Sequence, residues 1–229
     1  MRRPHAFLAF SVSAMVATSG LAADARHPTV VELFQSQGCS SCPPAAANLN
    51  ALAGRPDILA LSFGVTYWDY LGWKDIYASP KFTSRQWDYA RGLRRANVAT
   101  PQVVINGRLD VIGNDRRSLD AAIVRGDRGI SGPRLALDGN RVNVAEGTGE
   151  GDVWLVRFDP RIVNVPVKRG ENGGRVLPHR NVVKQLVKLG VWTGKPSSFS
   201  LPAATDAGLG TAVFIQANSG GPIIAAVRG

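Results

Sequence analysis

Two cysteines, Cys39 and Cys42, are the only thiols in this chain of 229 residues, and two serines separate them. A disulfide across this spacing closes a very short ring, to which the loop-entropy model assigns only about 2 kcal/mol. Small secreted domains held together by disulfides carry about four to eight cysteines. Stabilisation is therefore a weak reason for the pair, and reversible dithiol chemistry is favoured.

A metal site is the second reading of the same pair. Beyond the first 22 residues the chain keeps only His27 and His179, which are far apart and lack the spacing of zinc ligands. Two thiolates suit a soft ion such as Cu(I), but both methionines of the chain precede residue 22. We therefore expect no resident metal or other cofactor, and keep a non-catalytic binding or copper-handling module as the alternative function.

The N-terminus indicates where this chemistry takes place. Arg2 and Arg3 precede an apolar run over residues 6–17, and small residues follow as far as Ala22. This order is typical of a secretory signal peptide over residues 1–22, cleaved after Ala22 or, as second choice, after Ala25. We expect a periplasmic or secreted protein, since the remaining sequence has no segment long and apolar enough to span a bilayer.

The chain is basic, with a formal net charge of +10. In a cytosolic protein this charge would raise the possibility of a nucleic-acid partner. Export and the separation of the aromatic residues from the basic ones argue against it, so no nucleic-acid partner is expected. A basic run over residues 168–195 contains a single acid, Glu171, and is interpreted as a solvated face or as a docking surface for an acidic partner.

The residues around the cysteines predict how they are held. Residues 29–34 form an apolar, β-branched run typical of a buried strand, and residues 45–53 favour a helix. A strand, a loop and a helix in this order put Cys39 near a helix N-terminus, which lowers the pKa of a thiol. We expect Cys39 to be the exposed nucleophile and Cys42 the resolving thiol. Because Pro43 and Pro44 lack N–H donors, the helix begins at about Cys42 or is kinked.

Further elements follow along the first half of the chain. Residues 57–65 predict a second buried strand, and Ser79-Pro80 is a helix start. Asn106-Gly107 is a two-residue hairpin signal between two strands of residues 100–113, and residues 115–126 predict a last helix. The expected order is β-α-β-α-β-β-α.

With these elements in place, "VELFQSQGCSSCPPA", "YWDYLGWKD" and "ATPQVVINGR" resemble a family of secreted, thioredoxin-like bacterial proteins of unassigned function. The resemblance implies a thioredoxin fold in which Pro101 is cis and lies against the two cysteines, while the backbone of Thr100 binds an extended substrate. It also reveals a departure, because Leu33 occupies the position of thioredoxin's buried aspartate. Glu32 is adjacent but points to the other face of its strand, where it either pairs with an arginine or transfers protons.

An aromatic segment over residues 66–93 contains all four tyrosines and three of the five tryptophans. Large aromatic side chains are frequent both in cores and at binding surfaces. The segment is therefore either an insertion packed on its own small core or a wall of the substrate groove, formed by Trp68 and Trp73. Asp69 is a candidate local acid or base.

After residue 128 the pattern changes to short strand-like runs separated by turn signals. These runs cover residues 134–139, 140–147, 152–159, 162–170, 211–217 and 222–229. Such runs are typical of a small antiparallel sandwich. Residues 181–192 fit both helix and strand periods, and we favour a strand. The expected fold is therefore an α/β thioredoxin-like domain over residues 23–128, followed by a small antiparallel β-sandwich-like domain over residues 129–229 that recognises substrates or shields the dithiol.

The function predicted from these observations is that of an exported thiol–disulfide oxidoreductase. Cys39 attacks a disulfide of a protein or small-molecule substrate, and Cys42 resolves the mixed disulfide; the reverse sequence oxidises substrate thiols. Thr100, Pro101, Trp68 and Trp73 are the expected substrate-binding residues, and Glu32 and Asp69 the candidates for proton transfer.

Overall fold

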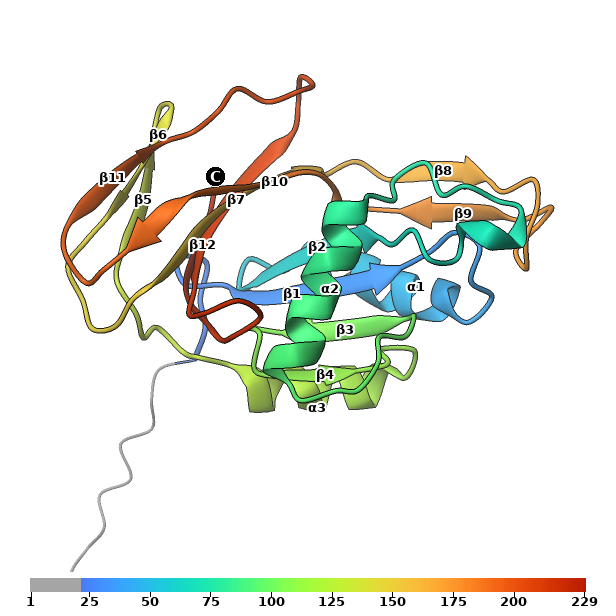
Figure 1. Cartoon of the computed structure of the whole chain (residues 1–229), viewed down its shortest axis with the longest axis horizontal. Coiled ribbons are helices and arrows are strands. Elements are labelled where there is room, and N and C mark those ends of the chain that lie inside the picture. Colours follow the sequence, from blue (N-terminus) through green and yellow to red (C-terminus); the bar gives the residue numbers. More distant parts are fainter. Residues whose placement is uncertain (1–21) are drawn as a thin grey trace, which may run out of the picture.

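Eight strands form one mixed sheet in the computed structural model of the protein, which describes residues 22–229 (Figure 1). The strand order across the sheet is β13-β12-β7-β10-β2-β1-β3-β4. Their bounds are β1 Thr29–Gln35, β2 Ile58–Gly64, β3 Gln102–Ile105, β4 Leu109–Val111, β7 Gly151–Asp159, β10 Val182–Trp192, β12 Gly210–Gln216 and β13 Ile223–Arg228. Strands β1 and β2 are parallel and buried along their whole length, as their nearly continuous apolar sequences require.

Helices cover both faces of the sheet in the first half of the chain. They are α1 (Cys42–Leu52), α2 (Pro80–Gly92) and α3 (Arg116–Gly126), with a short 3-10 helix η1 (Asp69–Leu71) before α2. Because side chains alternate along a strand, Val31 and Leu33 of β1 pack with α1 and α3 on one face. Val30 and Phe34 point to the other face and pack with α2. The expected order β-α-β-α-β-β-α is therefore present.

Local sequence signals account for the ends of several elements. The Ser79 hydroxyl accepts a hydrogen bond from the Lys81 backbone N–H and caps α2. Helix α1 begins at Cys42, immediately before the two prolines. Asn106 and Gly107 both have positive φ angles, of 46° and 63°, which the tight turn between β3 and β4 requires.

Two smaller sheets flank the large one. A three-stranded sheet in the order β11-β6-β5 packs on the strands of the second half through a core that includes the fully buried Trp192. A two-stranded hairpin, β8-β9, lies at the opposite end of the molecule, beyond the C-terminal ends of β1 and β2 (Figure 1). The bounds are β5 Leu135–Asp138, β6 Arg141–Val144, β11 Ser197–Ser200, β8 Val163–Pro166 and β9 Val176–His179.

The expectation of an α/β thioredoxin-like domain followed by a small antiparallel sandwich is wrong. Within the described residues the protein is mostly β, with thirteen strands and three α-helices, and its main sheet crosses the expected boundary at residue 128. Strand β10 joins the outer edge of β2, where the Ser62 N–H donates to the Asn181 carbonyl (3.0 Å) and the Asn181 side chain donates to the Ala60 carbonyl (2.8 Å). A single core containing Phe34, Phe158 and Phe214 unites the two halves.

The expected signal peptide lies, except for Ala22, outside the described residues. Among residues 22–229, no helix combines the length and apolar character needed to cross a membrane.

Candidate functional site

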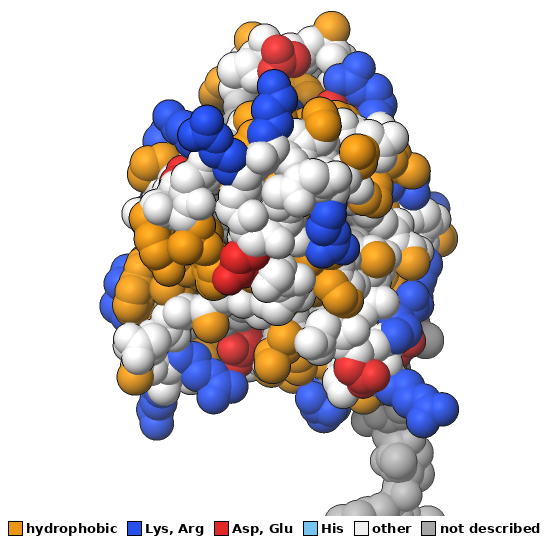
Figure 2. Space-filling model, turned by 90° about the vertical axis from the view of Figure 1, so that its right-hand side faces the viewer, with side chains coloured by type: hydrophobic (Ala, Val, Ile, Leu, Met, Phe, Trp, Pro, Cys, Tyr) orange, Lys and Arg blue, Asp and Glu red, His pale blue; other side chains and the backbone are white. Residues whose placement is uncertain are grey.

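Cys39 lies in the turn that joins β1 to α1, and Cys42 is the first residue of α1. This turn lies at the right-hand end of the molecule in Figure 1, the end that faces the viewer in Figure 2. Both thiols are free. Cys39 Sγ is 3.2 Å from the Ser41 hydroxyl and 3.8 Å from the Thr100 carbonyl oxygen. Cys39 has no exposed surface and Cys42 is 1% exposed, so the expected solvent-open nucleophile is in fact covered.

The surroundings of the two thiols separate their pKa values. Hydrogen bonding from Cys42 is the main influence that lowers the pKa of Cys39 to about 6, with help from Ser41 and Thr100 and against the effect of burial. Burial raises the pKa of Cys42 well above its usual value, and the adjacent Cys39 raises it further. Such a pair suits dithiol exchange, because Cys39 is a thiolate at neutral pH while Cys42 keeps its proton.

Alkylation of reduced Cys39 is therefore expected to accelerate as the pH rises and to reach half of its maximal rate near the pKa of about 6. An unperturbed thiol would give this midpoint at a pH of about 8.5. The measurement is the rate of iodoacetamide labelling against pH, with the labelled cysteine identified by mass spectrometry. In a Cys42→Ala control the donor is gone, and the midpoint should move to higher pH. A wild-type midpoint near that of a free thiol would contradict the hydrogen-bonded arrangement.

The loop before β3 borders the dithiol turn. The Thr100–Pro101 bond is cis, as the resemblance implied. Gln86 of α2 holds this loop, since its Nε2 donates both to the Ala99 carbonyl and to Gln102 Oε1, each at 2.8 Å. Its Oε1 accepts from the Tyr67 hydroxyl at 3.1 Å. The structure therefore brings the Thr100 carbonyl next to Cys39, while Gln86, which holds this loop, was missed by the sequence analysis.

The aromatic segment supports the dithiol turn from another side. Trp73 Nε1 donates to the Gln37 side chain at 2.9 Å, and the buried Asp75 carboxylate accepts from the Gln37 N–H at 2.8 Å. Burial raises the pKa of Asp75 to about 6. Trp68 is half-buried and stacks on Tyr70, with ring centroids 6.5 Å apart. Trp73 therefore contacts the dithiol turn through its hydrogen bond to the Gln37 side chain.

A loop between β8 and β9, residues 167–175, covers the dithiol turn from the second half of the chain. Asn172 is fully buried, and its Nδ2 donates to the Gln37 carbonyl (2.9 Å) and the Cys39 carbonyl (2.8 Å). The Glu171 carboxylate accepts from the Ser40 N–H at 2.9 Å. We call residues 167–175 the cover loop. Glu171, the single acid within the basic run of residues 168–195, therefore contacts the dithiol turn.

The two carboxylates considered for proton transfer have other partners. Glu32 lies on the face of β1 opposite to α1, where it forms a buried ion pair with Arg85 at 2.7 Å and accepts a hydrogen bond from Tyr89. Asp69 Oδ1 accepts from the Asp75 N–H at 3.1 Å. Within residues 22–229 neither carboxylate hydrogen-bonds to a thiol, so the structure places both in supporting roles.

A small cavity adjoins Cys42. It offers about 30 Å³ to the centre of a water molecule and is bordered by Gln35, Ser36 and His179. His179 is 3% exposed, and its Nδ1 is 3.2 Å from Gln35 Nε2. The sequence favours a hydrogen-bonded structural role for His179 over a ligand role, and the bond to Gln35 agrees with it. Its position beside Cys42 could not be predicted, because β9, the strand that carries it, is distant from the cysteines in the chain.

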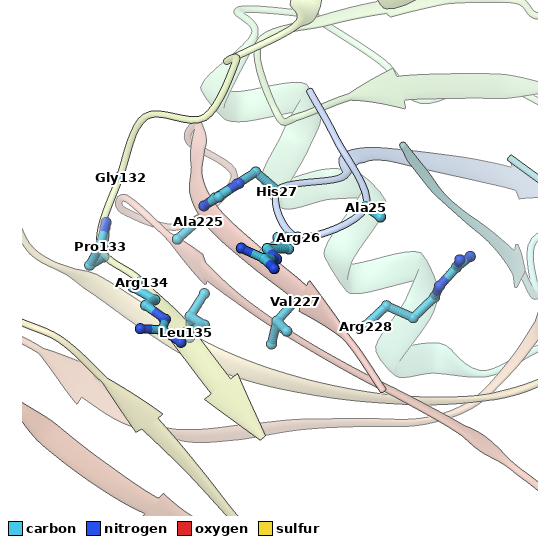
Figure 3. Close-up of a pocket in the computed structure, with 11 residues that line it drawn as sticks. Ala25, Arg26, His27, Gly132, Pro133, Arg134, Leu135, Ala225, Val227 and Arg228 are labelled. Atoms are coloured by element: carbon cyan, nitrogen blue, oxygen red, sulfur yellow. The ribbon is translucent and has the colours of Figure 1, made fainter. Parts of the chain in front are cut away.

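A larger cavity lies at the other end of the molecule, among the N-terminal segment, β5 and β13 (Figure 3). It has a volume of about 520 Å³ and is bordered by Arg26, His27, Arg134 and Arg228. His27 is hydrogen-bonded to Asp24 at 2.9 Å, and no thiol borders the cavity. The expected site residues are therefore all remote from it. Among residues 22–229, no group of three or more His, Cys, Asp or Glu side chains is arranged to hold a metal ion.

Comparisons with known proteins place this chain among proteins whose function is unknown. A protein-family model described as "Protein of unknown function (DUF1223)" matches residues 30–216. A crystal structure of a protein from Agrobacterium tumefaciens is 36% identical, covers 90% of this chain and 94% of its own, and superposes with a TM-score of 0.73. HBP35 of Porphyromonas gingivalis is 12% identical, covers 89% of this chain and 75% of its own, and has a TM-score of 0.58, which shows a shared fold alone. No curated protein matches.

Proposed function

This chain belongs to the DUF1223 family of proteins of unknown function, and we propose that it is an exported thiol–disulfide oxidoreductase that acts through Cys39 and Cys42. The observation that carries the proposal is the pairing of two free thiols with opposite pKa shifts in one turn. The resemblance of the C-S-S-C motif and of Thr100-Pro101 to thioredoxin-like proteins supports the same chemistry.

The proposed reaction proceeds in two steps. The Cys39 thiolate attacks one sulfur of a substrate disulfide, so that a Cys39–substrate disulfide forms and a substrate thiolate leaves and takes up a proton from solvent. Cys42 then loses its proton to solvent and attacks Cys39 Sγ, which releases the second substrate thiolate. The substrate disulfide gains two electrons and the dithiol becomes a disulfide. In reverse, the oxidised pair accepts two electrons from substrate thiols.

The substrates are protein or small-molecule thiols and disulfides. Access to Cys39 requires movement of its covering residues, because the residue has no exposed surface. This restriction disfavours indiscriminate reaction with envelope thiols and favours substrates able to displace part of the cover. The proposed location is the periplasm or the exterior, on the basis of the signal-like N-terminus.

Cys39→Ser is expected to abolish dithiol exchange, while Cys42→Ser is expected to keep the first step and to accumulate a mixed disulfide. The reason is that Cys39 supplies the attacking thiolate and Cys42 only the resolving one. The measurement is turnover of a fluorescent peptide disulfide, with the trapped adduct detected by mass spectrometry. Full turnover in Cys39→Ser would refute the mechanism. Tight stoichiometric Cu(I) binding by a wild-type protein without any exchange activity would favour the copper-handling alternative.

A further inference from the structure

The large cavity among the N-terminal segment, β5 and β13 has only basic side chains among its charged ones. They are Arg26, Arg134 and Arg228, accompanied by His27. The three arginines come from segments that are far apart in the sequence, and Figure 3 draws Arg26 between Arg134 and Arg228. The cavity volume of about 520 Å³ lies within the range of about 300–1,000 Å³ that is usual for small-molecule sites.

The three guanidinium groups have no carboxylate partner within residues 22–229. Arg228 makes only a long contact of 3.5 Å to the Ile58 carbonyl oxygen. A guanidinium has five N–H donors in a planar fork that fits the oxygens of a carboxylate or a phosphate. Three such groups that border one cavity repel one another, and a bound anion would remove this repulsion.

Asp24, the acid of the N-terminal segment, is used within its own turn. Its Oδ1 accepts hydrogen bonds from the backbone N–H groups of Arg26 and His27, each at 2.8 Å, and lies 2.9 Å from His27 Nδ1. Asp24 does not line the cavity. Its carboxylate therefore holds the turn that carries Arg26 and leaves the Arg26 guanidinium available to a ligand.

The opposite wall of the cavity is fixed by close backbone packing. Gly132 has a φ of 104°, and a Cβ at this position would lie 1.9 Å from the Ile224 carbonyl oxygen. Only glycine therefore lets the chain before β5 lie directly against β13. Leu135 and Ala225 are buried in one core, with Val227 packed against it. These apolar residues border the same cavity as the three arginines.

We propose that this cavity binds an organic anion that carries two or more carboxylate or phosphate groups. The charged groups of the ligand accept hydrogen bonds from the guanidiniums of Arg26, Arg134 and Arg228, because oxyanions accept paired bonds from arginine. The apolar part of the ligand packs on Leu135 and Val227. No thiol borders the cavity, so the inference is independent of the proposed oxidoreductase function.

Titration calorimetry of the purified full chain tests the proposal with trimesate, a benzene ring that carries three carboxylates. We expect saturable binding that weakens as salt is added, because Arg26 and Arg134 are exposed to screening ions. The neutral triamide of the same ring should not bind. A benzene bisphosphonate distinguishes the two kinds of charged group, since the tighter of the two aromatic anions identifies the preferred one. Pyrophosphate has no apolar part and should bind more weakly than either; equal or tighter binding would overturn the assignment of an organic ligand.

Arg134→Met is expected to weaken the binding of trimesate about tenfold, the effect of losing hydrogen bonds to a charged group. The double variant with Arg26→Met should lose saturable binding. Arg117→Met is the matched control, since Arg117 is an exposed arginine of α3 that does not line the cavity. Thermal unfolding supplies a second readout, because a ligand that binds only the folded chain raises the midpoint. Absence of saturable binding of both aromatic anions, or equal affinities in Arg134→Met and Arg117→Met, would overturn the inference.

Discussion

Replacing Arg85 by methionine is expected to lower the free energy of unfolding by about 3–5 kcal/mol, the usual cost of leaving a buried charge without its partner. Arg85 is 5% exposed and Glu32 is fully buried. Two guanidinium nitrogens of Arg85 contact the two carboxylate oxygens of Glu32 at 2.7 and 3.1 Å. The guanidinium also donates to Gln216 at 3.1 Å and to Tyr89 at 2.7 Å. The methionine variant would leave the Glu32 carboxylate in the core with only the Tyr89 hydroxyl.

The network matters because it joins elements that are far apart in the sequence. Arg85 comes from α2, Glu32 from β1 and Gln216 from β12. The Arg85 guanidinium also lies 5.0 Å from the ring centroid of Phe214 and 5.7 Å from that of Trp154. Its loss therefore weakens contacts between the first and second halves of the sheet.

Denaturant unfolding of reduced protein measures this effect, with Arg91→Met as the matched control. Arg91 pairs with Asp88 on the surface, and such exposed pairs contribute about 0–1 kcal/mol. A double variant, Arg85→Met with Glu32→Leu, should recover part of the lost stability because neither charge then remains alone. Equal losses in Arg85→Met and Arg91→Met would show that the buried pair has no special weight.

Local structure in the first half of the chain could be predicted because its signals are contained in a few adjacent residues. Ser79-Pro80 specifies a capped helix start, and Asn106-Gly107 specifies a turn with two positive φ angles. Local structure could also be predicted in the second half, since residues 182–192 form a strand, as the sequence pattern favoured. Strands β9 and β11 were missed, and both are four residues long.

Strand partners could not be predicted in the same way. An apolar run shows that a strand is buried, but it does not show which strand lies beside it. Strand β10 pairs with β2 across more than a hundred residues, through Asn181 and Ser62. Asn181 has a positive φ of 51° and its side chain donates to the Ala60 carbonyl at this junction, yet the residues around it in the sequence do not indicate which strand it joins. The prediction of a separate β-sandwich was wrong because this pairing between β10 and β2 could not be foreseen.

The candidate site likewise combines residues that could be predicted from the sequence with residues that could not. The short spacing of Cys39 and Cys42 identifies a dithiol from sequence alone, and the strand and helix that hold it are adjacent in the chain. Asn172 and His179 reach the same turn through β8 and β9, and no local pattern marks either residue. Glu171 did carry a weak signal, as the lone acid within a basic run.

Removing the Asn172 side chain is expected to raise the alkylation rate of Cys39 about 10- to 30-fold. Asn172→Ala deletes two buried hydrogen bonds to the dithiol turn, at the carbonyls of Gln37 and Cys39, and one partly buried bond from Arg175 within the cover loop itself. Each such bond contributes about 1 kcal/mol, and together they favour the closed cover loop over a locally opened state. Because the reduced Cys39 has no exposed surface, a reagent reaches it only from an opened state, so its labelling rate follows the population of that state.

Labelling of wild-type and variant protein under identical conditions provides the measurement, with Asn164→Ala as the matched control. Asn164 lies in the same β8-β9 hairpin but is exposed, so its removal should leave the labelling rate within about twofold, since surface changes of this kind typically have small effects. The Asn172→Ala variant should keep the pH midpoint of the wild type, because Asn172 contacts backbone oxygens and not the thiols. A higher rate at an unchanged midpoint separates access from thiol activation. If Asn172→Ala is labelled no faster than wild type, the cover loop does not control access to the dithiol.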